Sequence, residues 1–306
     1  MTAVAKPFQA KFLEGSIMRH VVIMTLTGAL GLMAVFLVDL ADLYFLSRLG
    51  NVDITAAIGF AGTLAFANLS ISIGTGIAAA ALVARNLGAQ QPERAREFAT
   101  SVLYFTLMVS AACTLMMVVF LDPILRILGA QGAALAQAKT FIYTLTPGFI
   151  CLSGALSCSF SLRGLGDAKR SMFITLSAAV TTLILDPIFI FTFGWGIQGA
   201  AAANAIADFA ALILGLHGLV YVHRFIGRFS IPALKRDFAP IWAIAFPSIL
   251  TQLALRLSAM MSFRLRRLLG AWCRWLLVSC FRCPAQWAQS SGKIMGPRIL
   301  IACAEL

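Results

Sequence analysis

Six polar side chains stand inside long apolar segments, and they are the residues of this chain best suited to chemistry. They are Asp39, Asp42, Asn68, Asp186, Asn204 and Asp208. A charged side chain inside a membrane span costs several kcal/mol, so the acids found there usually relay protons or bind ions. Asp39 and Asp42 are three residues apart and therefore share one face of a helix.

Asp42 and Asp186 are expected at a similar depth, in the outer halves of two different spans, as they would be if both faced one cavity. Pro187 should bend its helix and free backbone carbonyls beside Asp186. Such acids suit a proton-coupled carrier, and a negative, mostly apolar cavity suits a lipophilic cation. The competing interpretation is that the acids only pin helices together. For Asn68 and Asn204, hydrogen bonding between helices is the favoured role.

The elements that position these residues are seven apolar segments. The chain has 306 residues, of which 60% are apolar and 12% charged, whereas soluble domains have about 45–50% and about 25%. Each segment is long enough to cross a hydrocarbon core of about 30 Å as a helix. The sequence therefore predicts an all-α, polytopic transmembrane bundle. The segments cover residues 18–46, 54–83, 98–121, 140–160, 172–193, 198–222 and 238–261.

The distribution of basic residues predicts the orientation of the spans. With the N-terminus inside, the inner segments up to Arg236 hold thirteen Lys and Arg residues, and the outer loops hold three. Cytoplasmic loops are enriched in these residues, so a multi-pass protein of the cell (inner) membrane with a cytoplasmic N-terminus is expected. The net charge of +12 is assigned to these loops rather than to nucleic-acid binding, because no basic helix lies outside the apolar segments.

The last 45 residues differ from the rest of the chain. Residues 262–306 hold four of the seven Cys and three of the five Trp, and their Arg residues are spread throughout. A basic tail on the outer side breaks the charge pattern that the preceding residues follow. The hypothesis is that this segment is a truncated or out-of-frame continuation, and a real peripheral tail is the alternative.

No cluster of nucleophile and base, or of metal ligands, emerges from the sequence, so an enzyme is not expected. One motif keeps a remote alternative open. Residues 164–167 (GLGD) match the glycine–acid pattern of intramembrane aspartyl proteases, but they lie in a charged loop without a partner motif.

Six short motifs, in order and at the ends of the predicted spans, resemble the N-terminal half of the multidrug and toxic compound extrusion (MATE) family. The resemblance covers residues 13–261, and each motif alone is modest. The motifs are LEGSI at 13–17, DLYFLSRLG at 42–50, VARNLGAQ at 83–90, LRGLGDAK at 162–169, ILDPIFIF at 184–191 and GWGIQGAA at 194–201.

This resemblance implies a cation-coupled drug antiporter of two six-helix bundles, with H+ or Na+ as the coupling ion and no other cofactor or metal. The family's first-span and fifth-span acids match Asp42 and Asp186, although Leu43 replaces the usual Thr. A network Asn of some members corresponds to Thr182, and a sixth-span Thr corresponds to Asn204. Organic cations and amphiphilic drugs are the implied substrates.

The resemblance divides the chain into four parts. A cytoplasmic amphipathic N-terminus (1–17) precedes a six-helix bundle (18–223), a linker with the first helix of a second bundle (224–261), and the tail (262–306). A single bundle cannot form a cleft between two, so the chain is expected to be inactive as written unless two copies associate. The alternatives are an inactive membrane fragment and a lipid or polysaccharide flippase of the same superfamily.

Overall fold

The computed structural model describes residues 17–47, 52–227 and 230–260, and these residues form helices without any strand. The predicted all-α bundle is confirmed for this part of the chain. The helices are α1 (Ile17–Ser47), α2 (Val52–Gly88), α3 (Pro92–Val119), α4 (Leu121–Ile127), α5 (Gly132–Gly164), α6 (Ala168–Pro187), η2 (Ile188–Thr192), α7 (Ile197–Leu216), η3 (His217–Val222) and α8 (Ile231–Met260).

Helix ends fall where the chain carries proline, glycine or a capping acid. Pro92 is the first residue of α3, where its missing N–H costs nothing. Gly194 and Gly196 have φ of +67° and +55° in the turn between η2 and α7. Because side chains with a Cβ rarely adopt this left-handed region, glycine is what permits so tight a reversal.

Two α-helices pass into π-helical turns. η2 follows Pro187 directly, and the Phe193 N–H donates to the Ile188 carbonyl five residues earlier. In η3 the His223 N–H donates to the Gly218 carbonyl in the same way. Proline cannot donate to the carbonyl four residues before it, so the α-helical pattern is interrupted directly after Asp186. Such bulges often lie at functional sites.

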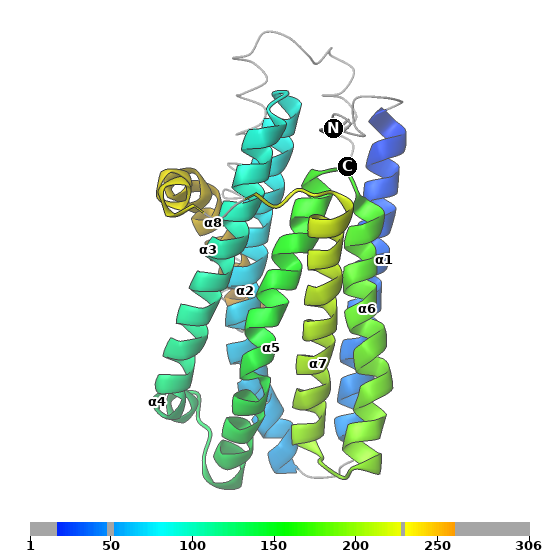
Figure 1. Ribbon diagram of the computed structural model, residues 1–306. Helices are drawn as coiled ribbons and strands as arrows, with labels where there is room; N and C mark the ends of the chain where they lie inside the picture. The colour runs from blue at the N-terminus through cyan, green and yellow to red at the C-terminus, as the bar shows by residue number, and fades with distance from the viewer. Residues whose placement is uncertain (1–16, 48–51, 228–229, 261–306) are drawn as a thin grey trace. The chain divides into compact units, whose positions relative to one another are not determined.

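α5 is the central helix of the bundle. It packs against α2, α3, α6 and α7, while α1 packs against α6, and Figure 1 shows these long helices side by side. Small residues permit close approaches: a Cβ on Gly76 of α2 would lie 2.3 Å from the Phe160 ring of α5. Tight packing of small residues is a main source of helix association in membranes.

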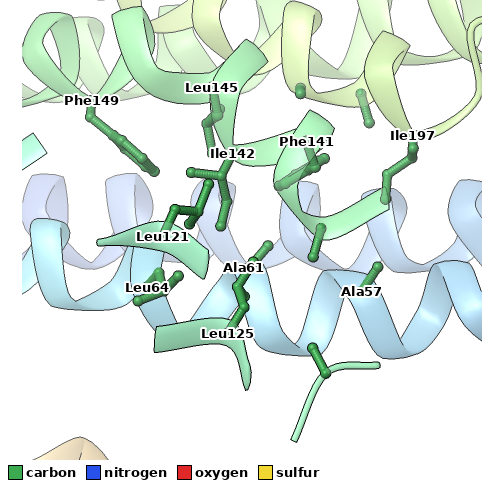
Figure 2. Packing of buried hydrophobic residues seen from close by; sticks show 14 of the residues in the cluster. Ala57, Ala61, Leu64, Leu121, Leu125, Phe141, Ile142, Leu145, Phe149 and Ile197 are labelled. Carbon is green, nitrogen blue, oxygen red and sulfur yellow. The ribbon is translucent and has the colours of Figure 1, made fainter. Parts of the chain in front are cut away.

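The buried core is apolar and continuous between neighbouring helices. Figure 2 shows one cluster, in which Ala61 and Leu64 of α2 lie beside Leu121 and Leu125 of α4 and Ile142 of α5. A second cluster joins α2, α3, α5 and α7, and a third joins α2, α3 and α8. α4 therefore covers one end of the α2–α5 interface.

Six of the described helical segments are long and apolar enough to cross a membrane: Val22–Asp42, Ala57–Gly88, Pro92–Val119, Gly132–Gly164, Ala168–Thr192 and Ile197–Val222. Each overlaps one of the first six segments predicted from the sequence. The seventh coincides with part of α8, so the prediction of about seven spans was close. Large apolar side chains such as Met33 and Phe36 are exposed on the bundle, as expected for surfaces that face lipid.

The chain divides into a unit that ends at Ile249 and a second that begins at Leu250. The first unit contains the bundle and most of α8. Of the second, only the last turns of α8 are described. The predicted N-terminal amphipathic segment and the predicted tail at 262–306 lie outside the described residues, apart from Ile17 at the start of α1.

Candidate functional site

The carboxyl groups of Asp42 on α1 and Asp186 on α6 lie close enough for each to influence the charge of the other. The two helices run in the same direction with a constant register. A Cβ on Gly31 would lie 3.6 Å from the Thr175 hydroxyl. Eleven residues further along both helices, the two acids meet. The structure thus brings together the two acids that the sequence placed at a similar depth.

Aromatic packing fixes the register of α1 beyond the acids. The Phe45 and Phe191 rings lie edge to face with centroids 6.0 Å apart. Such edge-to-face pairs add attraction beyond the area they bury. Since Phe191 belongs to η2, the π-helical turn after Pro187 supplies part of the surface against which α1 packs near the acid pair.

The acid pair has no protein counter-charge among the described residues. Asp186 is fully buried, and neither of its carboxylate oxygens meets a conventional hydrogen-bond donor in that part of the chain. One carboxylate oxygen of Asp42 is also buried without a hydrogen-bond donor among the described residues. None of the ion pairs found between described residues includes either acid. Two carboxylates so close cannot both stay ionised alone, so the pair can hold a proton or a cation between them.

The secondary candidates lie on α6, α7 and α1. Thr182 is buried one turn before Asp186 on α6, so the two share a face. On α7, the Asn204 amide donates to the Ala200 carbonyl of the same helix at 3.1 Å, whereas hydrogen bonding between helices was expected for it. Asp208 lies against α5, where a Cβ on Gly148 would be 3.2 Å from its carboxylate. Asp39 belongs to α1, but its side chain lies outside the described part.

Asn68 lies in a different part of the bundle and joins helices to one another. Its side-chain amide donates to the Thr114 hydroxyl of α3 at 2.9 Å. The Ser72 and Ser153 hydroxyls, from α2 and α5, are 2.6 Å apart one turn away, and Ser153 donates to Ser110 at 2.7 Å. The hydrogen bonding expected for Asn68 is thus observed. The Ser and Thr members were missed, although their spacing of four along each helix was a usable signal.

Two ionic clusters near helix ends also escaped the sequence analysis. Asp167 accepts from the Arg170 N–H as the cap of α6, and its carboxylate lies 2.9 Å from His223 Nε2 and 3.1 Å from the Arg170 guanidinium. Asp237 of α8 is 1% exposed and accepts from the Ser101 hydroxyl of α3 at 2.9 Å. Asp237 stands in a charged stretch, and no sequence signal distinguishes it from a solvated residue.

Comparison with known proteins shows which family this chain resembles. The sequence model of the MatE family matches residues 28–188. The FAD transporter of Shewanella oneidensis is 30% identical over 247 residues, covering 79% of this chain and 54% of that protein. The multidrug export protein MepA of Staphylococcus haemolyticus is 28% identical over 221 residues, covering 70% of this chain and 46% of that protein.

Solved structures of transporters also superpose on this chain. A mutant of the Vibrio cholerae MATE transporter VcmN superposes with a TM-score of 0.75 at 26% identity, covering 79% of this chain and 55% of that one. A MOP superfamily transporter from Pyrococcus furiosus gives a TM-score of 0.74 at 26% identity, covering 82% and 56%. The chain spans about half the length of the relatives it matches.

Proposed function

We propose that this chain, which belongs to the MatE family of membrane transporters, takes part in the export of organic cations in exchange for H+ or Na+. The family match confirms that the chain is a multi-pass membrane protein of a transporter family and not an enzyme. The substrate, the coupling ion and the exchange itself are the proposal. The observation that carries it is the Asp42–Asp186 pair, in which Asp186 is fully buried and which lacks a counter-charge among the described residues.

The proposed exchange follows from charge balance at this pair. A proton or Na+ held between Asp42 and Asp186 compensates their negative charge. An organic cation that approaches the pair can replace that ion, because only one positive charge is needed at a time. The displaced H+ or Na+ leaves to the aqueous phase. Binding of one cation and release of the other are therefore coupled without any covalent step.

The surroundings of the pair support a lipophilic cation as substrate. Phe45 and Phe191 lie beside the acids, and an apolar environment favours cations with large apolar groups over small hydrated ones. The multidrug export proteins among the relatives support the same class. We propose that transport also requires a second six-helix bundle, supplied by a longer chain or by a second copy, because export needs a passage that opens to alternate sides.

The proposed orientation places the N-terminus in the cytoplasm and the chain in the cell (inner) membrane. It rests on the excess of Lys and Arg in alternate loops. In this orientation α1 and α6 run outward, so the Asp42–Asp186 pair lies in the outer half of the membrane. The ionic cluster of Asp167, Arg170 and His223 then lies on the cytoplasmic side.

The test is proton or sodium release on binding of tetraphenylphosphonium to the purified chain in detergent. Calorimetry in two buffers of different ionisation enthalpy counts the protons released. Parallel titrations with and without NaCl detect competition by Na+. We expect about one H+ or Na+ released per bound cation, and at least about tenfold weaker binding in Asp42→Asn and Asp186→Asn, which corresponds to loss of one strong charge interaction.

Asp122→Asn is the matched control, because Asp122 is an exposed acid that pairs with Lys139. It should leave both affinity and ion release unchanged. Binding and ion release that persist in both Asp42→Asn and Asp186→Asn would contradict the proposal. The assay does not depend on a second bundle, since it measures binding rather than transport.

Export of a flavin dinucleotide is the second candidate. The observation that favours it is the similarity to the FAD transporter of Shewanella oneidensis, whose match covers more of this chain than the MepA match does. FAD contains an anionic diphosphate, which a pair of ionised acids repels and a pair compensated by H+ or Na+ tolerates. Titration with FAD in the same assay separates the two: FAD that binds while tetraphenylphosphonium does not would favour this candidate.

A further inference from the structure

Buried hydroxyl groups line the contact between α2, α3 and α5. The acid pair belongs to two other helices, α1 and α6. Ser72, Ser110 and Ser153 form one layer, with Ser153 2.7 Å from Ser110 and 2.6 Å from Ser72. These contacts fix which residues of the three helices face one another. The next layer along the bundle can therefore be read from the helix register.

α2 and α5 run in the same direction, and α3 runs opposite to both. The Ser72–Ser153 contact and the approach of Gly76 to Phe160 place successive turns of α2 beside successive turns of α5. Along α3 the order is reversed, because Thr114 contacts Asn68 of α2, whereas Ser110, one turn earlier in α3, lies in the layer of Ser72, one turn later in α2. One turn beyond the serine layer, a second layer thus brings together Thr75, Thr106 and Ser157.

Two hydroxyls of this second layer depart from the pattern of the rest of the bundle. Buried Ser and Thr residues in helices usually donate to the carbonyl four residues earlier, as Ser72 and Thr75 do here. Thr106 and Ser157 are both fully buried, yet their hydroxyls have no hydrogen-bond partner among the described residues. Neither hydroxyl therefore makes the hydrogen bond to its own helix that is usual for a buried Ser or Thr.

A buried hydroxyl without a partner is costly, and a shared internal water is the usual means of satisfying two of them. Thr75 adds an acceptor, since its own proton is donated to the Ile71 and Ser72 carbonyls. Three oxygens around one water match the number of hydrogen bonds that such waters typically make. Ser161, one turn further along α5, is also buried with an unpartnered hydroxyl.

We propose that an internal water molecule binds between Thr75, Thr106 and Ser157 and links α2, α3 and α5 at this level. A water fits this site better than a metal cation, because these helices carry no charged residue over 54–84, 98–121 and 140–162. The water continues the hydrogen-bonded layer of Ser72, Ser110 and Ser153. The site is a hydrated joint between three spans, separate from the Asp42–Asp186 pair.

Thermal unfolding of the full chain in detergent tests this site. If water bridges the layer, Thr106→Val and Ser157→Ala each lower Tm by about 2–4 °C, because each leaves the remaining water contacts incomplete. The double variant should lose less than the sum, since the two residues share one partner. Thr144→Val is the control, because Thr144 lies on α5 with Ser157, is only half-buried, and already donates to the Thr140 carbonyl in an exposed hydrogen bond. It should leave Tm unchanged.

A dry site predicts the opposite sign. Removal of an unsatisfied buried hydroxyl relieves its desolvation cost, so a rise of Tm in both single variants would overturn the proposal. Repeating the melts in NaCl and choline chloride addresses a bound cation. Equal Tm values are expected, and stabilisation by Na+ that is lost in Ser157→Ala would overturn the assignment to water.

Infrared spectroscopy provides a second readout that does not depend on stability. An O–H stretching band of internal water should shift when the sample is exchanged into H2(18)O, in the unmodified chain and in Thr144→Val. The band should be absent in Ser157→Ala. If the Ser157→Ala protein does not fold, Thr106→Val provides the same test, and the band should be absent there too. An identical isotope-sensitive spectrum in all folded variants would contradict the proposed site.

Discussion

At the residue scale, the acids in the described part of the chain fall into two groups. Acids near helix ends, such as Asp167 and Asp237, have basic or hydroxyl partners from neighbouring segments. Asp42 and Asp186, inside the spans, have no basic partner among the described side chains. Paired acids fix structure, whereas acids left without a counter-charge keep the capacity to bind an ion. This contrast distinguishes anchoring acids from the proposed coupling acids.

Asp167 provides a test of the anchoring role. Asp167→Ala removes the cap of α6 and the contacts to Arg170 and His223, and we expect a loss of about 1–2 kcal/mol of stability. Asp167→Asn keeps a capping oxygen and should lose less. Melting curves in detergent measure both. Glu93→Gln, at an exposed position in the first turn of α3, is the control, and equal losses in Asp167→Ala and Glu93→Gln would contradict the assignment.

The residue scale also marks the limit of what sequence patterns predict. Asp42 and Asp186 could be paired from the sequence because intramembrane acids are rare and helix rise gives their depth. Asp237 could not, because its burial depends on how α8 meets α3, and the local sequence resembles any charged helix start. The hydroxyls of Thr106 and Ser157 were also missed, since Ser and Thr are common in spans and only the register brings these two together.

At the element scale, close contacts between helices depend on glycines at particular positions. A Cβ on Gly199 of α7 would lie 2.8 Å from the Phe189 carbonyl in η2. The contacted atoms are backbone, so a substitution must displace one element against the other. Gly62 of α2 differs, because a Cβ there would meet nothing within 4 Å.

We therefore expect Gly199→Ala to lower the free energy of unfolding by about 1–3 kcal/mol. Gly62→Ala should be neutral or slightly stabilising, because alanine is the better helix former. Thermal melts of the two variants beside the unmodified chain make the comparison. A Gly199→Ala protein as stable as Gly62→Ala would show that the α7–η2 contact tolerates a methyl group.

α8 is held on α3 by a small ionic network. The Asp237 carboxylate accepts from Ser101 at 2.9 Å and from Arg236 at 3.1 Å, while Glu97 contacts Arg236 at 2.8 Å. Around it, Phe238 and Trp242 lie edge to face with Phe105 of α3. This arrangement anchors the first half of α8 on the bundle.

Asp237→Ala should destabilise the chain by about 1.5–3 kcal/mol, because it removes buried hydrogen bonds to a charged group. Glu97→Gln should change stability by less than about 1 kcal/mol, because the Glu97–Arg236 pair is about half exposed on both sides. Denaturation of both variants under one set of conditions ranks the two effects. The reverse order would mean that the exposed pair, rather than the buried carboxylate, holds α8.

At the scale of the whole molecule, the orientation in the membrane can be predicted from which loops carry the basic residues. The α2–α3 turn at Gln91 and the α4–α5 turn at Gln131 lie at opposite ends of α3. Arg85, Arg94 and Arg96 lie near the first turn, and only Arg126 and Lys139 lie near the second. Lys139 is moreover paired with Asp122. The excess of basic residues therefore predicts that the α2–α3 turn is cytoplasmic.

Single cysteines at these two turns test the orientation. Gln91→Cys and Gln131→Cys are made in a chain whose seven native cysteines are replaced, and intact cells are treated with a membrane-impermeant maleimide. Both positions are exposed, so accessibility depends on the side of the membrane alone. We expect the Gln131→Cys protein to be labelled at once and the Gln91→Cys protein only after permeabilisation. Labelling in the opposite order would place the Asp42–Asp186 pair in the inner half of the membrane, so that the coupling ion would reach it from the cytoplasm.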